Sequence, residues 1–180
     1  MDLRDELPSD RHTVRDLHLA AFGDHGRVVA DLTDDLRDTG APVLSVVADQ
    51  DGQVAGHVMV TRGLLDAPRR LVEVGVLSPL AVLPALQRRG LGAALVRHGL
   101  ADLAERGVPL VFLEGDPGYY SRLGFTPGGD LGFRKPSLRI PDGAFQVVTL
   151  PAYEPWMTGT LVYAEPFWRH DAVGLRDPHA

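Results

Sequence analysis

The segment from Leu80 to Ala94 holds the residues whose types and spacing most directly indicate chemistry. An apolar run, Leu71 to Val82, ends just before Pro84, and a Gly-rich turn, Gln87 to Gly92, leads into a helical pattern that continues to Arg106. Glycine lets the backbone approach a ligand closely, and the first N–H groups of a helix have no internal partner. The segment therefore predicts a cradle for a phosphate or pyrophosphate group at a helix start.

Two other phosphate-binding loops compete with this interpretation. A Walker loop needs Gly-Lys-Ser/Thr, whereas two alanines follow Gly92, so that loop is excluded. A dinucleotide-binding fingerprint needs a small residue where Leu95 stands, which disfavours it, although Glu114 and Asp116 lie near the distance at which a ribose-binding acid is expected. Two glycines at this spacing also suit an ordinary tight turn, so the neighbouring residues must decide.

The residues around the two glycines follow one pattern in register: Val82, Pro84, Gln87, Gly90 and Gly92. The segment resembles motif A of the GNAT superfamily of N-acetyltransferases, which has the form V-x-P-x-x-Q/R-x-x-G-x-G/A. Five matching positions in one register favour this resemblance over a tight turn of no further significance.

A second segment, Val108 to Phe125, extends the resemblance. An apolar strand is followed by a short helix that ends Tyr-x-x-x-Gly-Phe, as in the family, and Tyr120, Gly124 and Phe125 fill this pattern. Many relatives carry an asparagine late in the strand, where this chain has Glu114-Gly115-Asp116. The residue pattern of this segment is closer to that of a bacterial subgroup of predicted acetyltransferases. An aromatic core residue remains the alternative role for Tyr120.

The resemblance implies transfer of an acetyl group from acetyl-CoA to a primary amine of a small-molecule or peptide acceptor, with both substrates bound together and no covalent enzyme intermediate. It implies that the Tyr120 hydroxyl protonates the departing thiolate. It also implies that the pantetheine arm pairs with the backbone near Leu80 and Val82. Arg88 and Arg89 are placed to reach the phosphates, and two arginines at a helix start also suit an ordinary solvated surface. The cofactor-binding residues expected on this basis are Leu80, Ala81, Val82, Gln87, Arg88, Arg89, Gly90, Leu91, Gly92 and Ala93.

An amine nucleophile is mostly protonated near neutral pH, so a base or a water chain must accept its proton. The candidate bases are Glu73, Glu114 and Asp116. Each of these carboxylates is also compatible with an ordinary surface position, and the sequence does not show which strand face lines the acceptor site.

The rest of the chain predicts the elements that hold these segments. In order, we expect a helix from an N-cap at Ser9 to Phe22, a helix from Arg27 to Thr39, strands at Val43 to Ala48 and Gln53 to Leu64 around an Asp51-Gly52 turn, the strand to Val82, the helix Gly90 to Arg106, a strand at Leu110 to Leu113, a short helix at Tyr119 to Leu123, a loop at Pro127 to Gly143, and strands at Phe145 to Leu150 and Gly159 to Glu165. This order predicts an α/β fold of the GNAT-like acyl-CoA N-acyltransferase type, with a central mixed sheet and helices on both faces.

Composition narrows the function classes. With 180 residues, 44% of them apolar and 23% charged, we expect a single domain over residues 1–180, with 166–180 as a loosely held tail. The net charge of −6 disfavours nucleic acid, and no apolar stretch suits a signal peptide or a membrane span, so we expect a cytoplasmic protein with no membrane partner. The chain has no cysteine and no pair of histidines at i, i+4 spacing, so we expect no metal site. The sequence leaves open whether the protein forms a homodimer. The alternative function is a non-catalytic regulatory module that binds acyl-CoA and has no need of Tyr120.

Overall fold

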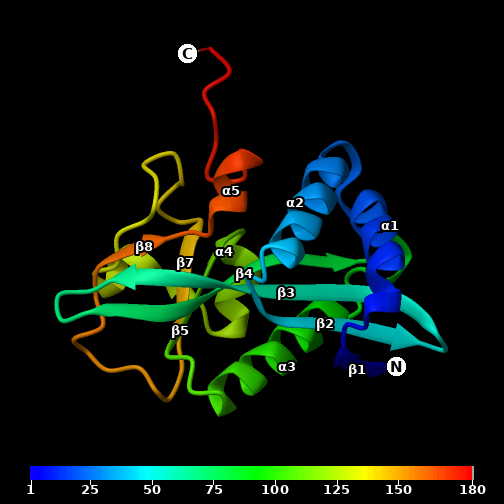
Figure 1. The fold of residues 1–180 in the computed structure, drawn as a ribbon, viewed down its shortest axis with the longest axis horizontal. Helices are drawn as coiled ribbons and strands as arrows, with labels where there is room; N and C mark the ends of the chain where they lie inside the picture. Colours follow the sequence, from blue (N-terminus) through cyan, green and yellow to red (C-terminus); the bar gives the residue numbers. More distant parts are fainter. Residues whose placement is uncertain (180) are drawn as a thin grey trace. The chain divides into compact units, whose positions relative to one another are not determined.

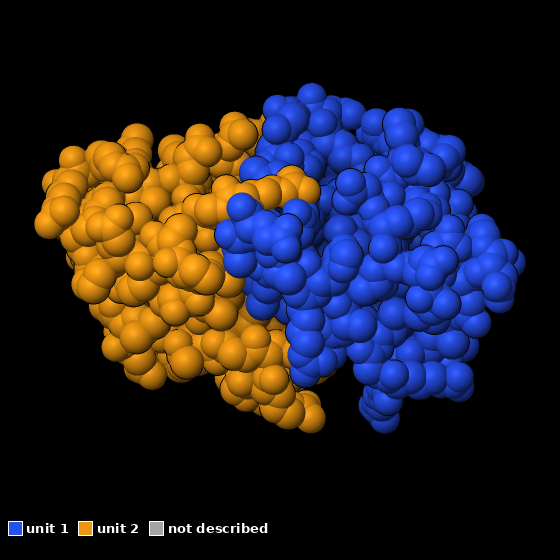
Figure 2. Space-filling model, turned by 90° about the horizontal axis from the view of Figure 1, so that it is seen from below, with its two compact units in different colours: residues 1–61, 77–105 blue, residues 62–76, 106–180 orange. Residues whose placement is uncertain are grey.

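The computed structural model describes residues 1–179, and its internal contacts divide the chain into two compact units. Unit 1 comprises Met1–Thr61 and Leu77–Glu105, and unit 2 comprises Arg62–Val76 and Arg106–Ala180 (Figure 2). The strands β3 (Gln53–Asp66) and β4 (Leu71–Val82) each contribute residues to both units.

The strands form one eight-stranded mixed sheet in the order β1-β2-β3-β4-β5-β7-β6, with β8 paired to β3 (Figure 1). The pairing of β4 with β5 is parallel, whereas β2–β3 and β5–β7 are antiparallel. The remaining strands are β1 (Asp2–Asp5), β2 (Pro42–Gln50), β5 (Leu110–Glu114), β6 (Thr126–Pro127), β7 (Phe145–Thr149) and β8 (Thr160–Val162). The helices are α1 (Arg11–Phe22), α2 (Gly26–Asp38), α3 (Leu91–Glu105), α4 (Pro117–Tyr120) and α5 (Glu165–Arg169), with short 3₁₀ turns at Pro8–Asp10, Gly23–His25, Pro84–Leu86, Ser121–Leu123 and Gly128–Leu131. The predicted mixed sheet is confirmed.

In unit 1 both faces of the sheet are covered by helices. Three consecutive residues of β2, Val46 to Ala48, are fully buried, which requires cover on both sides because successive side chains of a strand point to opposite faces. Figure 1 shows α1 and α2 on one side of β2 and β3, and α3 on the other. On the α3 side, a β-carbon added at Gly56 would lie 2.9 Å from Leu95 Cδ1. Glycine at that position therefore lets α3 pack closely on β3.

The predicted hairpin at Asp51-Gly52 is confirmed. Both residues have positive φ angles, 53° and 84°, as a two-residue turn between twisted strands requires. The Gly52 N–H donates to Asp49 Oδ1 at 2.8 Å, which holds the turn closed.

Unit 2 has a core of aromatic rings on β5 and its neighbours. Phe112 packs edge-on against Phe133, with ring centroids 5.1 Å apart, and stacks on Phe145 at 5.7 Å. After β8 the chain enters α5, where Phe167 is buried, and Val173 beyond it is fully buried. The Gly174 N–H donates to Glu114 Oε1 at 2.9 Å, so this part of the expected tail is held within unit 2 and is not loose.

Four local features of the structure differ from the expectations. The strand β1 was not predicted, because its four residues, Asp-Leu-Arg-Asp, have no apolar alternation, and it forms through antiparallel pairing with β2. Ser9 is not the N-cap of the first helix: it lies inside a 3₁₀ turn, and α1 begins at Arg11. The side chain of Asp10 accepts the Leu7 N–H at 2.8 Å, so this aspartate closes the turn instead. The short β6 and α5 were also missed.

Across residues 1–179, no helix combines the length and the apolar character that crossing a bilayer requires.

Candidate active site

The predicted phosphate cradle lies in unit 1, where β4 leads through the 3₁₀ turn Pro84–Leu86 into α3. Arg88 and Gly90 have positive φ angles of 61° and 87°. A β-carbon at Gly90 would meet nothing within 4 Å, so glycine is favoured there by backbone conformation and not by lack of space. The turn leads into a helix of 15 residues, and the first N–H groups of this helix have no partner within it, which suits an anion.

The side chains of the cradle have two different roles. Gln87 Nε2 donates to the Val82 carbonyl oxygen at 3.1 Å, so Gln87 braces the turn against the end of β4. Arg88 and Arg89 are exposed beside it and available to a charged ligand. The Leu83 N–H donates to the Ala55 carbonyl oxygen at 2.9 Å, which fixes the residue after β4 to β3. The other expected cofactor-binding residues lie on the same path: Leu80, Ala81 and Val82 end β4, and Leu91, Gly92 and Ala93 open α3.

Tyr120 lies in unit 2 at the end of α4, directly after β5. Its ring packs edge-on against Tyr119 at 4.9 Å and against Phe125 at 5.7 Å. A β-carbon at Gly115 would lie 2.5 Å from Tyr120 Cε2, so the bare glycine leaves the space that the ring occupies. Burial, followed by the neighbouring Tyr119, raises the pKa of Tyr120 above its usual value of 10.0. A phenol is protonated near neutral pH even at its usual pKa, so Tyr120 carries a proton that it can donate.

The three candidate bases, all in unit 2, have different surroundings. The Asp116 carboxylate accepts the Gly118 N–H at 2.8 Å and caps α4, which is a structural role. The Glu73 side chain is 72% exposed, with Oε1 3.6 Å from Arg62 Nε. Glu114 Oε1 accepts the Gly174 N–H at 2.9 Å, and burial raises its pKa against the opposing effect of that hydrogen bond.

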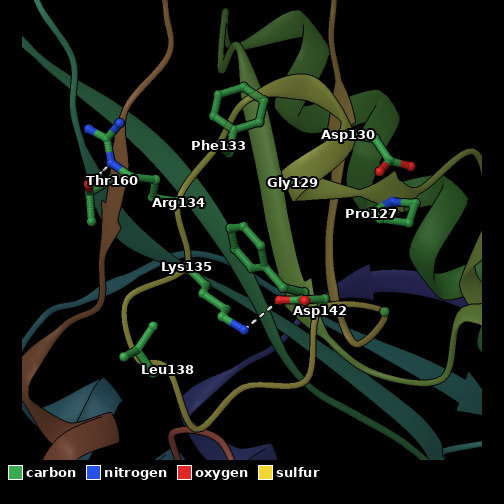
Figure 3. Close-up of a pocket in the computed structure, with 11 residues that line it drawn as sticks. Pro127, Gly129, Asp130, Phe133, Arg134, Lys135, Leu138, Asp142 and Thr160 are labelled. Carbon is green, nitrogen blue, oxygen red and sulfur yellow. Dashed lines mark hydrogen bonds and ion pairs between the residues drawn. The ribbon is translucent and has the colours of Figure 1, made fainter.

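Unit 2 also contains a pocket of about 670 Å³ that the sequence did not predict (Figure 3). Phe133 and Phe145 contribute its apolar wall, and Lys135 crosses it to contact Asp142 Oδ1 at 2.6 Å. Arg134 lies at one side, where its Nε donates to Thr160 Oγ1 at 2.9 Å. The full lining is Pro127, Gly129, Asp130, Phe133, Arg134, Lys135, Leu138, Asp142, Gly143, Phe145 and Thr160.

A buried polar cluster in unit 1 was also missed. The Ser45 hydroxyl donates to the Glu6 carboxylate, which also accepts from Arg37 Nη2 at 2.5 Å. Ser45 Oγ lies 2.9 Å from His57 Nε2, and His57 Nδ1 lies 3.0 Å from His18 Nε2. Burial alone would raise the pKa of Glu6. Contacts with His57, whose Nε2 lies 3.6 Å from Glu6 Oε2, and with Ser45 and Arg37 lower that pKa to about 2. An ionised Glu6 accepts the hydrogen bond of the Ser45 hydroxyl, so Ser45 Oγ must accept from His57 Nε2. His57 Nδ1 then accepts from His18 Nε2.

This order of donors leaves both imidazoles neutral with their protons on Nε2. The two rings are fully buried, and burial lowers the pKa of His18 from 6.5 to about 3 and also lowers that of His57. The His18 Nδ1 atom has no hydrogen-bond partner among the residues that the structure describes. The sequence does not indicate this contact, because none of the seven histidines forms an i, i+4 pair. The contact joins two separate elements, α1 and β3.

Known proteins resemble this chain over most of its length. A family model described as an acetyltransferase (GNAT) domain matches residues 3–128. The uncharacterized N-acetyltransferase YjhQ of Escherichia coli (strain K12) is 34% identical over 168 residues, which is 88% of this chain and 89% of that protein. The GNAT family N-acetyltransferase YhbS of Escherichia coli, solved in complex with CoA, has a TM-score of 0.84 at 33% identity and covers 93% of this chain and 92% of its own.

A GNAT family acetyltransferase from Brucella melitensis, solved in complex with acetyl-CoA, has a TM-score of 0.75 at 32% identity, covering 92% of this chain and 97% of its own. These relatives share about a third of their residues with this chain over most of its length. They indicate the same family as the glycine turn before α3 and the Tyr120 segment after β5. The chain belongs to the GNAT family of acetyltransferases and is an enzyme of that family.

Proposed function

We propose that this enzyme transfers an acetyl group from acetyl-CoA to a primary amine by direct attack, with both substrates bound together. The observation that carries the proposal is that two solved relatives, each covering more than nine-tenths of this chain, hold CoA and acetyl-CoA. The same fold here carries the two features that this substrate needs, an anion cradle before α3 and a protonated phenol at Tyr120.

The cradle suits the pyrophosphate of acetyl-CoA. The N–H groups of Leu91, Gly92 and Ala93 open α3 and face no preceding helical turn, and Arg88 and Arg89 add positive charge beside them. The pantetheine arm then runs along Leu80 to Val82. The Val82 carbonyl oxygen is engaged by Gln87 in the structure, so Gln87 positions the cradle and competes with the arm for that acceptor.

In the reaction the amine nitrogen attacks the thioester carbonyl carbon, and the C–S bond breaks as the amide C–N bond is completed. Tyr120 gives its phenolic proton to the departing thiolate, and the amine proton passes to a base. Among the three candidate carboxylates, Glu114 is the best suited, because its raised pKa lies closer to neutrality, whereas Asp116 is held as a helix cap and Glu73 faces solvent.

Two measurements test this function. Titration calorimetry with acetyl-CoA and with CoA tests the cradle, and thiol release from acetyl-CoA across amines, amino acids and peptide N-termini tests the transfer. We expect binding of both nucleotides and thiol release with at least one amine. Failure to bind acetyl-CoA contradicts the proposal, and tight binding without turnover across the panel favours the regulatory module instead. A cytoplasmic location stays part of the proposal.

A further inference from the structure

The pocket of unit 2 is built on the same chain segments that hold Tyr120. Phe145, on its wall, is the cross-strand partner of Glu114 at the end of β5. The following Gly115 donates its N–H to the Ala144 carbonyl oxygen at 3.0 Å and leaves room for the Tyr120 ring. The pocket wall and the proposed proton donor are therefore positioned by one continuous piece of structure.

A second part of the lining follows shortly after the Tyr120 segment along the chain. Pro127 and Gly129 line the pocket, and between them a β-carbon at Gly128 would lie 2.5 Å from the Phe145 ring. This close packing fixes the turn against β7. Because both parts of the lining are rigidly tied to well-packed strands, the pocket is a preformed site.

The polar side chains of the pocket differ in whether their charged atoms already have a partner in the protein. Lys135 Nζ is occupied, since it donates to the Ile140 carbonyl oxygen and to Asp142, each at 2.6 Å. Arg134 uses only Nε, so its two terminal nitrogens have no partner among residues 1–179. The Asp130 carboxylate, on the other side in Figure 3, also makes no ion pair within the described part of the chain.

These features define one ligand chemistry. A guanidinium with two free terminal NH₂ groups matches a carboxylate, an unpaired carboxylate matches an amine, and the phenylalanine wall matches an apolar group. Building on the proposed acetyl transfer, we propose that this pocket takes the acetyl acceptor and that the acceptor is an apolar amino acid or a close analogue, held by its carboxylate on Arg134 and by its side chain on Phe133 and Phe145.

The first test measures binding without any turnover. Lys135 is the only lysine in the chain, so protein labelled with [¹³Cε]lysine gives one side-chain signal, and that signal reports on the pocket. The probes are L-phenylalanine and 2-phenylethylamine, which lacks the carboxylate. We expect L-phenylalanine to shift the Lys135 signal, and 2-phenylethylamine to bind at least about tenfold more weakly.

Variants assign that difference to Arg134. We expect Arg134→Gln to weaken L-phenylalanine about tenfold or more and to leave 2-phenylethylamine unchanged. Arg97→Gln, an exposed arginine on α3, is the matched control and should change neither. Equal binding of both probes, or an Arg134→Gln variant that binds L-phenylalanine as well as the parent does, overturns the inference.

The second test uses thiol release from acetyl-CoA. We expect L-phenylalanine or another apolar amino acid to be acetylated, with Arg134→Gln raising the acceptor KM about tenfold and leaving the KM for acetyl-CoA unchanged. Binding in the pocket without acetylation of any such amino acid overturns the assignment as acceptor. If simple amines are acetylated and Arg134→Gln does not change their KM, the acceptor assignment is overturned and the proposed function stands. If acetyl-CoA does not bind, the proposed function itself is overturned.

Discussion

Lowering the pH from about 7 to about 5 should destabilise the fold through the buried pair His18 and His57. Burial lowers the pKa of His18 from 6.5 to about 3, so between these values the unfolded chain binds a proton that the folded chain does not. Stability from this group is complete above pH 6.5 and is lost as the pH falls toward 3. Each pH unit changes the free energy of unfolding by about 1.4 kcal/mol for one proton.

Between pH 6.5 and about pH 5 the loss from His18 alone is therefore about 2 kcal/mol. The pKa of His57 is lowered in the same direction, and its contribution adds to that loss. A loss of this size is large against the ~5–15 kcal/mol that stabilises a typical domain. Urea unfolding at a series of pH values, followed by circular dichroism, measures it.

Two variants separate this pair from other titrating groups. His18→Phe keeps a flat ring but leaves His57 Nδ1 without its donor, so it should be less stable near pH 7 by about 1–3 kcal/mol and show a shallower decline with acid. His98→Gln, at an exposed position on α3, is the control and should keep the parent's slope. A parent protein equally stable at both pH values, or a His18→Phe variant with the parent's slope, would show that the histidines are not held neutral by burial.

Two further predictions concern the cradle and the tyrosine. Gly92→Glu places a carboxylate at the start of α3, so it should remain folded by circular dichroism yet lose acetyl-CoA binding in calorimetry, and unchanged affinity in the folded variant contradicts the cradle. Gly115→Ala puts a β-carbon 2.5 Å from Tyr120 Cε2 and displaces the ring, so kcat should fall about tenfold or more while the dissociation constant of acetyl-CoA stays within a few-fold; an unchanged kcat contradicts the tight packing of that ring.

The sequence alone was sufficient to predict the structure in places where a local residue pattern determines the backbone conformation. Asp51-Gly52 predicts its hairpin because both turn residues need positive φ, and Gly90, which also has a positive φ, predicts the turn before α3. The spacing between Tyr120 and Phe125 matched a family pattern, and the structure places both rings in contact. In these places neighbours in the chain are also neighbours in space.

The rest depends on contacts between distant parts of the chain. His18 and His57 are 39 residues apart and meet only when α1 packs on β3, so neither shows its role in its own segment. Phe133 and Arg134 lie in a Gly- and Pro-rich stretch without periodicity, and their pocket forms because that stretch returns to β7 and β8.

The role of Tyr120 as proton donor is the central chemical claim, and paired variants test it most directly. General acids contribute on the order of 10²–10⁴ in rate, but a thiol is already a good leaving group, so we expect the low end. Once an acceptor is known, Tyr120→Phe should lower kcat about 10–100-fold with acetyl-CoA affinity within a few-fold, whereas Tyr119→Phe, the adjacent control, should change kcat little. Normal turnover by Tyr120→Phe, or loss of turnover in Tyr119→Phe instead, contradicts the account.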